Sequence, residues 1–224
     1  MKRFSMLFVI LVLGVVLGIQ STSHATLTLF LDDHAGHTAT ISDSNADGVV
    51  NYSGNLGGWN IASSVALSPP FNGTMSKPEM DLSGAFKYTG GGAGSLTILA
   101  SEVGFGPATG TVTFFGSVSS TLPTNMSANF KYWLNDNNAL FGTQSQLGST
   151  IAMTYPGGFS SGSASGPATG DYSLTVEADF PATGGQDSSA SFDQNIRAPE
   201  PTTLILLGSG LAALGIWTRR RFRR

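Results

Sequence analysis

The segment with the clearest potential for metal chemistry is residues 43–48, DSNADG, which continues as VVN. Side-chain oxygens recur at every second position, on Asp43, Asn45 and Asp47, and Asn51 follows four residues later. Hard cations such as Ca²⁺ bind carboxylate and amide oxygens, and a glycine in sixth position permits the sharp turn of such a loop. The spacing therefore identifies Asp43, Asn45, Asp47 and Asn51 as candidate calcium ligands.

The same segment resembles the first half of an EF-hand loop, and its continuation is closest to the dockerin version of that loop. The twelfth position, where that loop has a bidentate carboxylate, is Gly54. The segments on either side have the alternation of strands, not the periodicity of helices. Asp47-Gly48 is also a common β-hairpin signal. A turn is the favoured interpretation, and a calcium loop stays open as the alternative.

The sequence shows no other recognisable catalytic or metal-binding motif, although a pair of carboxylates for glycoside hydrolysis stays open because any two strands can bring such a pair together. There is no cysteine, and outside the first 25 residues the only histidines are His34 and His37, too few for a zinc site. No Gly-x-Ser-x-Gly elbow or Ser/His/Asp set stands out. The sequence therefore predicts a protein that is not an enzyme. The acidic residues on or beside predicted strands are expected to face mostly solvent: Glu79, Asp81, Glu102 and Glu177.

Charge divides the chain into an acidic middle and two basic ends. Residues 26–198 contain thirteen acidic and four Lys/Arg side chains, a balance of −9, whereas the whole chain has a net charge of −3. Binding to a nucleic-acid backbone needs clustered Lys and Arg. The balance argues against a nucleic-acid partner and favours an exported surface protein.

The middle of the chain has the pattern of an all-β protein. Apolar and small polar residues alternate in short segments bounded by Gly, Pro, Asn and Asp, and no segment has a sustained 3.6-residue apolar stripe. We expect one domain over residues 26–198, an antiparallel β-sandwich of jelly-roll or Ig-like topology. The predicted strands are Thr26–Asp32, Thr38–Ser42, Val49–Ser53, Trp59–Leu67, Asp81–Thr89, Ser95–Glu102, Gly110–Ser119, Ser127–Leu134, Ser149–Tyr155, Asp171–Asp179 and Ala190–Arg197.

Most aromatic residues of this domain are expected in its core or half-buried on its strands. Exposed ones would be able to stack on sugar rings, and the candidates are Trp59, Tyr88, Tyr132, Trp133 and Tyr155.

The N-terminus has the three parts of a secretory signal peptide over residues 1–25. Lys2 and Arg3 precede an apolar run of about 14 residues, and the segment ends on Ser-His-Ala. This run is shorter than the ~20 residues that a membrane-spanning helix needs. We therefore expect a signal helix that the secretion machinery inserts and that signal peptidase cuts between Ala25 and Thr26.

The C-terminus, residues 199–224, combines a short apolar span with a basic end. Residues 202–218 carry no charge and would reach ~25 Å as a helix, close to the thickness of a bilayer core. Arginines follow directly and are expected to stay cytoplasmic, so that the body lies outside. These membrane-stop residues, within the basic end 219–224, are Arg219, Arg220, Arg221, Arg223 and Arg224.

The tail as a whole resembles the PEP-CTERM sorting signal. The resemblance rests on Pro199-Glu200-Pro201, the Leu/Gly/Ala-rich span and the terminal arginines, in that order. It implies a Gram-negative bacterium that makes exopolysaccharide, and a membrane protease-transpeptidase, the exosortase, that recognises the tripeptide and removes the tail. The protein would pass through the inner membrane transiently and end at the cell surface or in the extracellular matrix.

For residues 26–198 the sequence favours a structural or adhesive role associated with exopolysaccharide. A carbohydrate-binding module, with or without help from calcium, is the alternative, and a secreted hydrolase is favoured least.

Overall fold

The computed structural model of the protein describes residues 26–184 and 188–199. The predicted signal helix, Ala25, Glu200, Pro201, the predicted span 202–218 and the terminal arginines lie outside the described residues. Among the residues that are described, no helix has the length and apolarity to cross a membrane.

The described chain consists of strands, turns and loops, which confirms the all-β prediction. All strand pairs are antiparallel. The strands are β1 (Thr28–Asp32), β2 (Thr38–Ser42), β3 (Val49–Leu56), β4 (Trp59–Leu67), β5 (Gly73–Thr74), β6 (Lys77–Tyr88), β7 (Gly94–Thr121), β8 (Ser127–Asn135), β9 (Ser145–Gln146), β10 (Ile151–Thr154), β11 (Gly157–Ala182) and β12 (Ser188–Arg197).

Two long strands, β7 and β11, connect the whole sheet. They pair with each other from Gly94↔Ala182 to Thr121↔Gly157. The first half of β7 also pairs with β1, and the second half with β12. Each long strand therefore belongs to two layers, and the sheet is continuous where it folds over.

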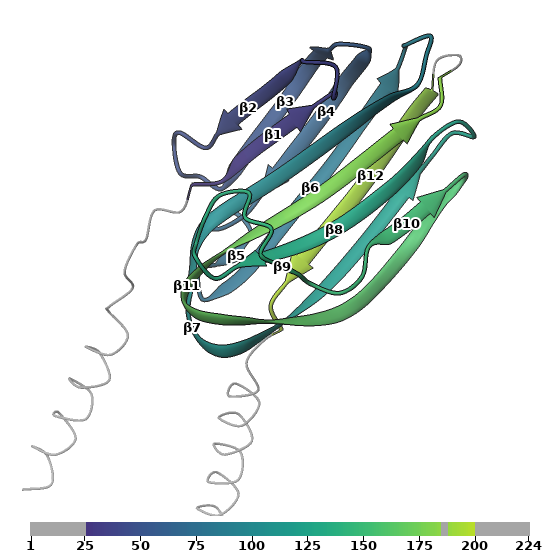
Figure 1. Cartoon of the computed structure of the whole chain (residues 1–224). Helices are drawn as coiled ribbons and strands as arrows, with labels where there is room; N and C mark the ends of the chain where they lie inside the picture. Colours follow the sequence, from purple (N-terminus) through teal and green to yellow (C-terminus); the bar gives the residue numbers. More distant parts are fainter. Residues whose placement is uncertain (1–25, 185–187, 200–224) are drawn as a thin grey trace, which may run out of the picture.

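The fold-over lies where β7 and β11 are rich in glycine. Gly104 and Gly106 on β7 have φ of 85° and 121°, and Gly170 on β11 has φ of 80°. Side-chain-bearing residues rarely adopt such angles. The register between the two strands also shifts on both sides of Tyr172. Glycines and irregular pairing let both strands curve together around the lower edge of the molecule in Figure 1.

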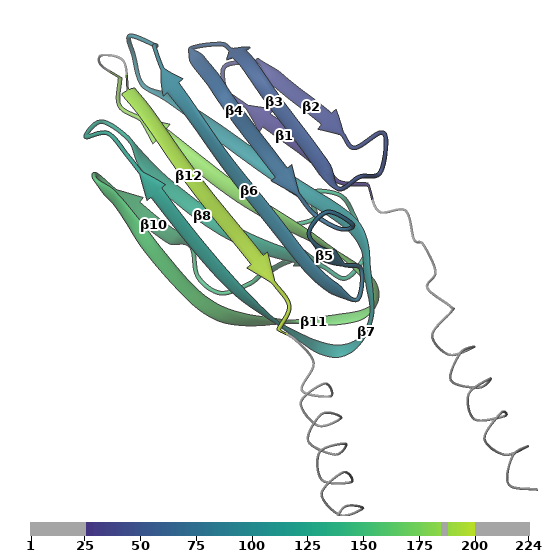
Figure 2. The same cartoon turned by 180° about the vertical axis from the view of Figure 1, so that it is seen from behind.

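The two layers have different neighbours (Figures 1 and 2). The first layer contains β2, β1, the first half of β7, the second half of β11, β8 and β10. The second contains the first half of β11, the second half of β7, β12, β6, β4 and β3. The segment between β2 and β3 crosses from one layer to the other.

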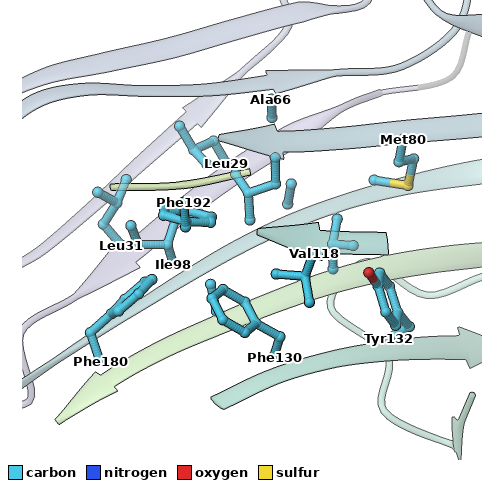
Figure 3. Packing of buried hydrophobic residues seen from close by; sticks show 14 of the residues in the cluster. Leu29, Leu31, Ala66, Met80, Ile98, Val118, Phe130, Tyr132, Phe180 and Phe192 are labelled. Carbon is cyan, nitrogen blue, oxygen red and sulfur yellow. The ribbon is translucent and has the colours of Figure 1, made fainter. Parts of the chain in front are cut away.

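Aromatic side chains from both layers meet in the core. Phe180 of β11 lies 4.6 Å from Phe86 of β6, 5.0 Å from Phe192 of β12 and 5.8 Å from Phe130 of β8, measured between ring centroids. Figure 3 shows Phe130, Phe180 and Phe192 among aliphatic residues of both layers. Burial of these rings and of their aliphatic neighbours is the main stabilising contribution to the fold.

Each predicted strand overlaps an observed one, the short strands β5 and β9 were not predicted, and the largest differences involve β7 and β11. The predicted strands Ser95–Glu102 and Gly110–Ser119 are parts of one strand, β7. Strand β11 begins at Gly157, fourteen residues before the predicted start at Asp171. Its added part is rich in Gly and Ser, which have low strand propensity, and pairing with β7 holds it extended.

Candidate functional site

A band of polar side chains covers the outer surface of the first layer. On β8, Phe130 and Tyr132 point into the core, so alternation turns Lys131 and Trp133 outward. The same alternation turns Glu177 and Asp179 of β11 outward. We call this surface the polar face, defined as Ser95, Thr97, Asn129, Lys131, Trp133, Glu177 and Asp179.

Strand register brings the charged members of the polar face together. Glu177 lies opposite Lys131 in the β11–β8 pair, and Trp133 is two residues further along β8. The Lys131 Nζ donates to Glu177 Oε1 at 2.6 Å, and the Trp133 Nε1 donates to Glu177 Oε2 at 2.7 Å. Lys131 Nζ also lies 6.0 Å from the centre of the Trp133 ring. Two donors thus hold one half-buried carboxylate and fix the orientation of the indole.

Asp179 is the centre of a second set of hydrogen bonds on the polar face. Its Oδ1 accepts from Ser95 Oγ at 3.0 Å and Thr97 Oγ1 at 3.2 Å. Thr97 Oγ1 is also 2.8 Å from the Nε2 of His34, in the β1–β2 loop. Polar groups therefore extend in a row from this loop across β7 and β11.

A loop between β8 and β9 covers one end of the same surface. The backbone N–H of Phe141 donates to Ser101 Oγ at 2.9 Å, and the Phe141 ring lies 5.9 Å from Phe30 of β1. Leu140 at the loop's tip is 41% exposed. The apolar side chains of this loop therefore border the polar face.

The polar face combines planar polar groups, an oriented indole and a bordering apolar loop. Sugar rings have apolar faces and hydroxyls along their edges, so these are the features that bind them.

The structure places three of the predicted calcium ligands in one turn. Asp43, Asn45 and Asp47 lie between β2 and β3, and Asn51 is an exposed residue of β3. Asn45 Nδ2 donates to Asp47 Oδ2 at 2.8 Å, and Asp47 Oδ1 accepts from Val49 N at 3.0 Å. The hairpin interpretation of this turn is wrong, because β2 and β3 do not pair and belong to different layers.

Asp43 differs from its neighbours because it points inward. Its Oδ2 accepts from the backbone N–H of Gly48 at 2.8 Å, and its Oδ1 is buried without a hydrogen-bond partner in the described part of the chain. Glu102 of β7 is fully buried, and neither of its carboxylate oxygens has such a partner. The pKa of Glu102 is raised to about 8, chiefly by burial and also by the negative charge of Asp43, while interaction with the Ser68 hydroxyl lowers it.

Glu102 is the exception to the expectation that acidic residues on strands would face mostly solvent, because Glu79, Asp81 and Glu177 are partly exposed and alternate with buried residues. The signal for its burial was present in the sequence. Residues 95–102 alternate, and Glu102 is in phase with the core residues Leu96, Ile98 and Ala100. Three or more acidic or histidine side chains do not gather into a metal-binding group anywhere in residues 26–184 and 188–199.

The two histidines lie in the β1–β2 loop. Asp33 is buried, and it accepts from the backbone N–H groups of Ala35 and His37 at 2.8 and 2.9 Å. The His37 Nδ1 lies 2.7 Å from Asp33 Oδ2. The carboxylate thus stabilises the loop through local hydrogen bonds.

The outer surface of the second layer holds a separate acidic pair. Asp81 of β6 and Asp193 of β12 lie diagonally across neighbouring strands. The pKa of Asp81 is raised to about 6, chiefly by burial and in addition by the charge of Asp193 and a side-chain hydrogen bond with it. Asn195 lowers the same pKa by hydrogen bonding.

Most predicted aromatic candidates are core residues, as the sequence indicated. Trp59, Tyr88 and Tyr132 are buried, and the Tyr132 hydroxyl donates to the carbonyl of Ser117 at 2.9 Å. Trp133 lies on the polar face, and Tyr155, in the β10–β11 turn, is 59% exposed.

The sorting tripeptide begins where the described fold ends. The backbone N–H of Ala198 donates to the carbonyl of Pro78 at 2.9 Å, so the chain is fixed to β6 one residue before Pro199. A cavity of about 570 Å³ adjoins this point, and Phe115, Arg197 and Pro199 are among the residues that line it.

A family model described as the PEP-CTERM protein-sorting motif matches residues 197–221. The predicted resemblance of the tail is therefore confirmed. The motif indicates export and sorting to the cell surface.

A comparison with curated protein sequences finds no match. Among solved structures, the adhesin domain of Epf from Streptococcus pyogenes is 10% identical with a TM-score of 0.40, over 76% of this chain and 57% of that one. This chain thus spans a little over half the length of that relative. The cleaved adhesin domain K1 of Lys-gingipain from Porphyromonas gingivalis W83 is 12% identical, with a TM-score of 0.30. The match covers 68% of this chain and 98% of that domain. TmCBM61, solved with β-1,4-galactotriose, is 9% identical, with a TM-score of 0.27. The match covers 70% of this chain and 85% of TmCBM61.

Proposed function

We propose that the protein is a non-enzymatic surface protein that binds extracellular polysaccharide through the polar face. The observation that carries this proposal is the arrangement around Glu177. Lys131 and Trp133 hold its carboxylate in place, so the indole is pre-oriented at the surface. A pre-oriented aromatic side chain loses little conformational entropy when a sugar ring stacks on it.

The remaining polar groups of the face suit a ligand with many hydroxyls. Asp179, Thr97 and Asn129 offer acceptors and donors along strands that run side by side, spaced as neighbouring strands are, about 4.8 Å apart. An extended chain of sugars would be able to contact several of them in succession. The domain as a whole is acidic, so a neutral polysaccharide fits better than a strongly acidic one.

We also propose how the protein reaches this ligand. Signal peptidase would cut between Ala25 and Thr26, and residues 26–198 would fold outside as one domain. The span 202–218 would hold the protein briefly in the inner membrane with its arginines in the cytoplasm. An exosortase would then cleave at Pro199-Glu200-Pro201 and release the domain to the cell surface or matrix, where it acts as an adhesive component.

The binding proposal is tested by affinity electrophoresis or titration calorimetry. The probes are the exopolysaccharide of the producing bacterium and a set of neutral and acidic polysaccharides. We expect binding to a neutral polysaccharide, weakened about five- to tenfold in Trp133→Ala, since loss of one aromatic stacking contact amounts to roughly 1–1.5 kcal/mol.

Tyr155→Ala is the matched control because it removes an exposed aromatic side chain that is not a member of the polar face. Equal losses in both variants, or unchanged binding in Trp133→Ala, would contradict the assignment of the face. Failure of the parent protein to bind any of these polysaccharides would contradict the proposed function.

A further inference from the structure

Four buried oxygen atoms with no hydrogen-bond partner in the described part of the chain belong to three neighbouring residues. They are both carboxylate oxygens of Glu102, Oδ1 of Asp43 and Oγ of Ser68. Hydrogen bonds and strand register bring the three residues together. The Gly48 N–H donates to Asp43 Oδ2 at 2.8 Å, and the Ser68 N–H donates to the Gly48 carbonyl. The Asp43 N–H donates to the carbonyl of Leu27, the residue before Thr28, and Thr28 pairs with Ser101 next to Glu102. Buried polar atoms are almost always hydrogen-bonded, so a group of four such oxygens requires an explanation.

Backbone contacts hold the three residues in place. The N–H of Asp43 donates to the carbonyl of Leu27 at 2.9 Å, which ties the residue to the start of β1. The N–H of Ser68 donates to the carbonyl of Gly48 at 2.9 Å and joins the turn after β4 to the β2–β3 connection. Gly48 has φ of 77°, and a β-carbon there would overlap the carbonyl of Ser68. The oxygens therefore belong to a compact and well-defined part of the fold.

Charge indicates what these oxygens bind. Two carboxylates at one buried place repel each other, and each loses its hydration. One proton would neutralise one of them, whereas a divalent cation compensates both. Carboxylate and hydroxyl oxygens with no histidine or cysteine form a ligand set for a hard cation.

We propose that Asp43, Ser68 and Glu102 form a Ca²⁺ site between the two layers. Ca²⁺ accepts six to eight oxygens in irregular arrangements, so main-chain carbonyls and water would complete the site, whereas Mg²⁺ demands a near-ideal octahedron. Of the four calcium ligands that the sequence predicts, the proposed site retains only Asp43. Ser68 and Glu102 take the place of Asn45, Asp47 and Asn51. The site is independent of the polar face.

The position of the site gives the cation a structural role. Glu102 lies two residues before Gly104, where β7 begins to cross between layers, and Asp43 begins the β2–β3 connection, which also crosses. Ser68 follows β4 of the second layer. A cation bound by all three would link the fold-over of β7 to both layers at this edge of the molecule.

The test uses full-length protein purified in mild detergent and freed of metal with EDTA. Titration calorimetry with CaCl₂ should give one Ca²⁺ per chain. Thermal unfolding followed by circular dichroism should show a midpoint about 5–10 °C higher once Ca²⁺ exceeds its Kd a hundredfold. MgCl₂ at the same concentration should raise it far less.

Three variants locate the site. Glu102→Gln and Asp43→Asn keep the size of the side chain and should abolish the Ca²⁺-dependent shift. Asp47→Asn, in the exposed part of the same turn, should keep it. Circular dichroism in EDTA confirms that each variant is folded.

The proposal would be overturned by absence of Ca²⁺ binding in the parent, by an equal shift with Mg²⁺, or by loss of the shift in Asp47→Asn with its retention in Glu102→Gln. If a proton satisfies Glu102 instead, the metal-free protein will show no response to Ca²⁺ at any pH, which also refutes the site.

Discussion

The ion pair on the polar face gives a prediction whose size follows from its geometry. In Lys131→Met, Glu177 keeps the hydrogen bond from Trp133 and loses the one from Lys131 Nζ, which measures 2.6 Å. The Lys131 and Glu177 side chains are 27% and 15% exposed, so water replaces the lost donor only in part. The Lys131 stem is apolar like that of methionine, so the substitution tests the charge more than the packing.

Two reference values bracket the expected effect. Hydrogen bonds to charged groups contribute ~1.5–3 kcal/mol, and fully exposed ion pairs contribute ~0–1 kcal/mol. The partial burial places this pair between them, at about 1–2 kcal/mol. For a domain of this size each kcal/mol corresponds to roughly 2–4 °C in the unfolding midpoint, so we expect a decrease of about 2–8 °C.

A double-mutant cycle with Glu177→Gln isolates the interaction, because any change in packing caused by methionine occurs in both arms and cancels. Unfolding by urea gives the free energies, and Lys77→Met on β6 controls for a change of net charge. The affinity of Lys131→Met for the polysaccharide should also decrease, since the Lys131–Glu177 pair helps to orient Trp133. A coupling free energy below about 0.3 kcal/mol would refute the reasoning, because the two side chains would then act independently.

Three further predictions concern the core, the acidic pair and the tail. Phe180→Ala should lower the free energy of unfolding by about 3–5 kcal/mol in urea titrations, whereas Phe159→Ala, at a side chain that is 71% exposed, should change it by less than about 0.5 kcal/mol. The pKa of Asp81 is raised to about 6 in the folded protein, so its contribution to stability is complete below its unfolded pKa of about 3.8 and is lost as the pH rises through 6. The unfolding midpoint should therefore decrease between pH 4.5 and 7.5, and by less in Asp193→Asn; an equal decrease in both would exclude the pair as a cause. Mass spectrometry of surface-recovered protein should find a C-terminus at the sorting tripeptide, and an intact Arg224 would instead indicate a plain membrane anchor.

Local signals in the sequence were sufficient for the parts of the protein that depend on local physics. Alternation over residues 127–134 and 171–179 predicted both strands and the outward direction of Glu177, because a strand turns successive side chains to opposite faces. The tail was identified for a similar reason. Its tripeptide, span and arginines are consecutive in the sequence, and no folding is needed to bring them together.

Long-range pairing decided the rest. The Gly/Ser-rich start of β11 has no strand signal of its own and is extended because β7 pairs with it. Lys131 and Glu177 are 46 residues apart, and their contact depends on the register of β8 against β11. Registers are set by packing and by distant turns, which a single sequence does not display.

The same contrast applies to the two groups of oxygen atoms considered as metal ligands. The sequence determined that Asp43, Asn45 and Asp47 would share one turn, because they are neighbours in the chain. Only the tertiary structure decided that Asp43 points inward and meets Glu102 and Ser68, which come from β7 and from the turn after β4. Burial between two layers is a property of the whole fold, and at the proposed site it leaves two carboxylates whose charge a divalent cation would compensate.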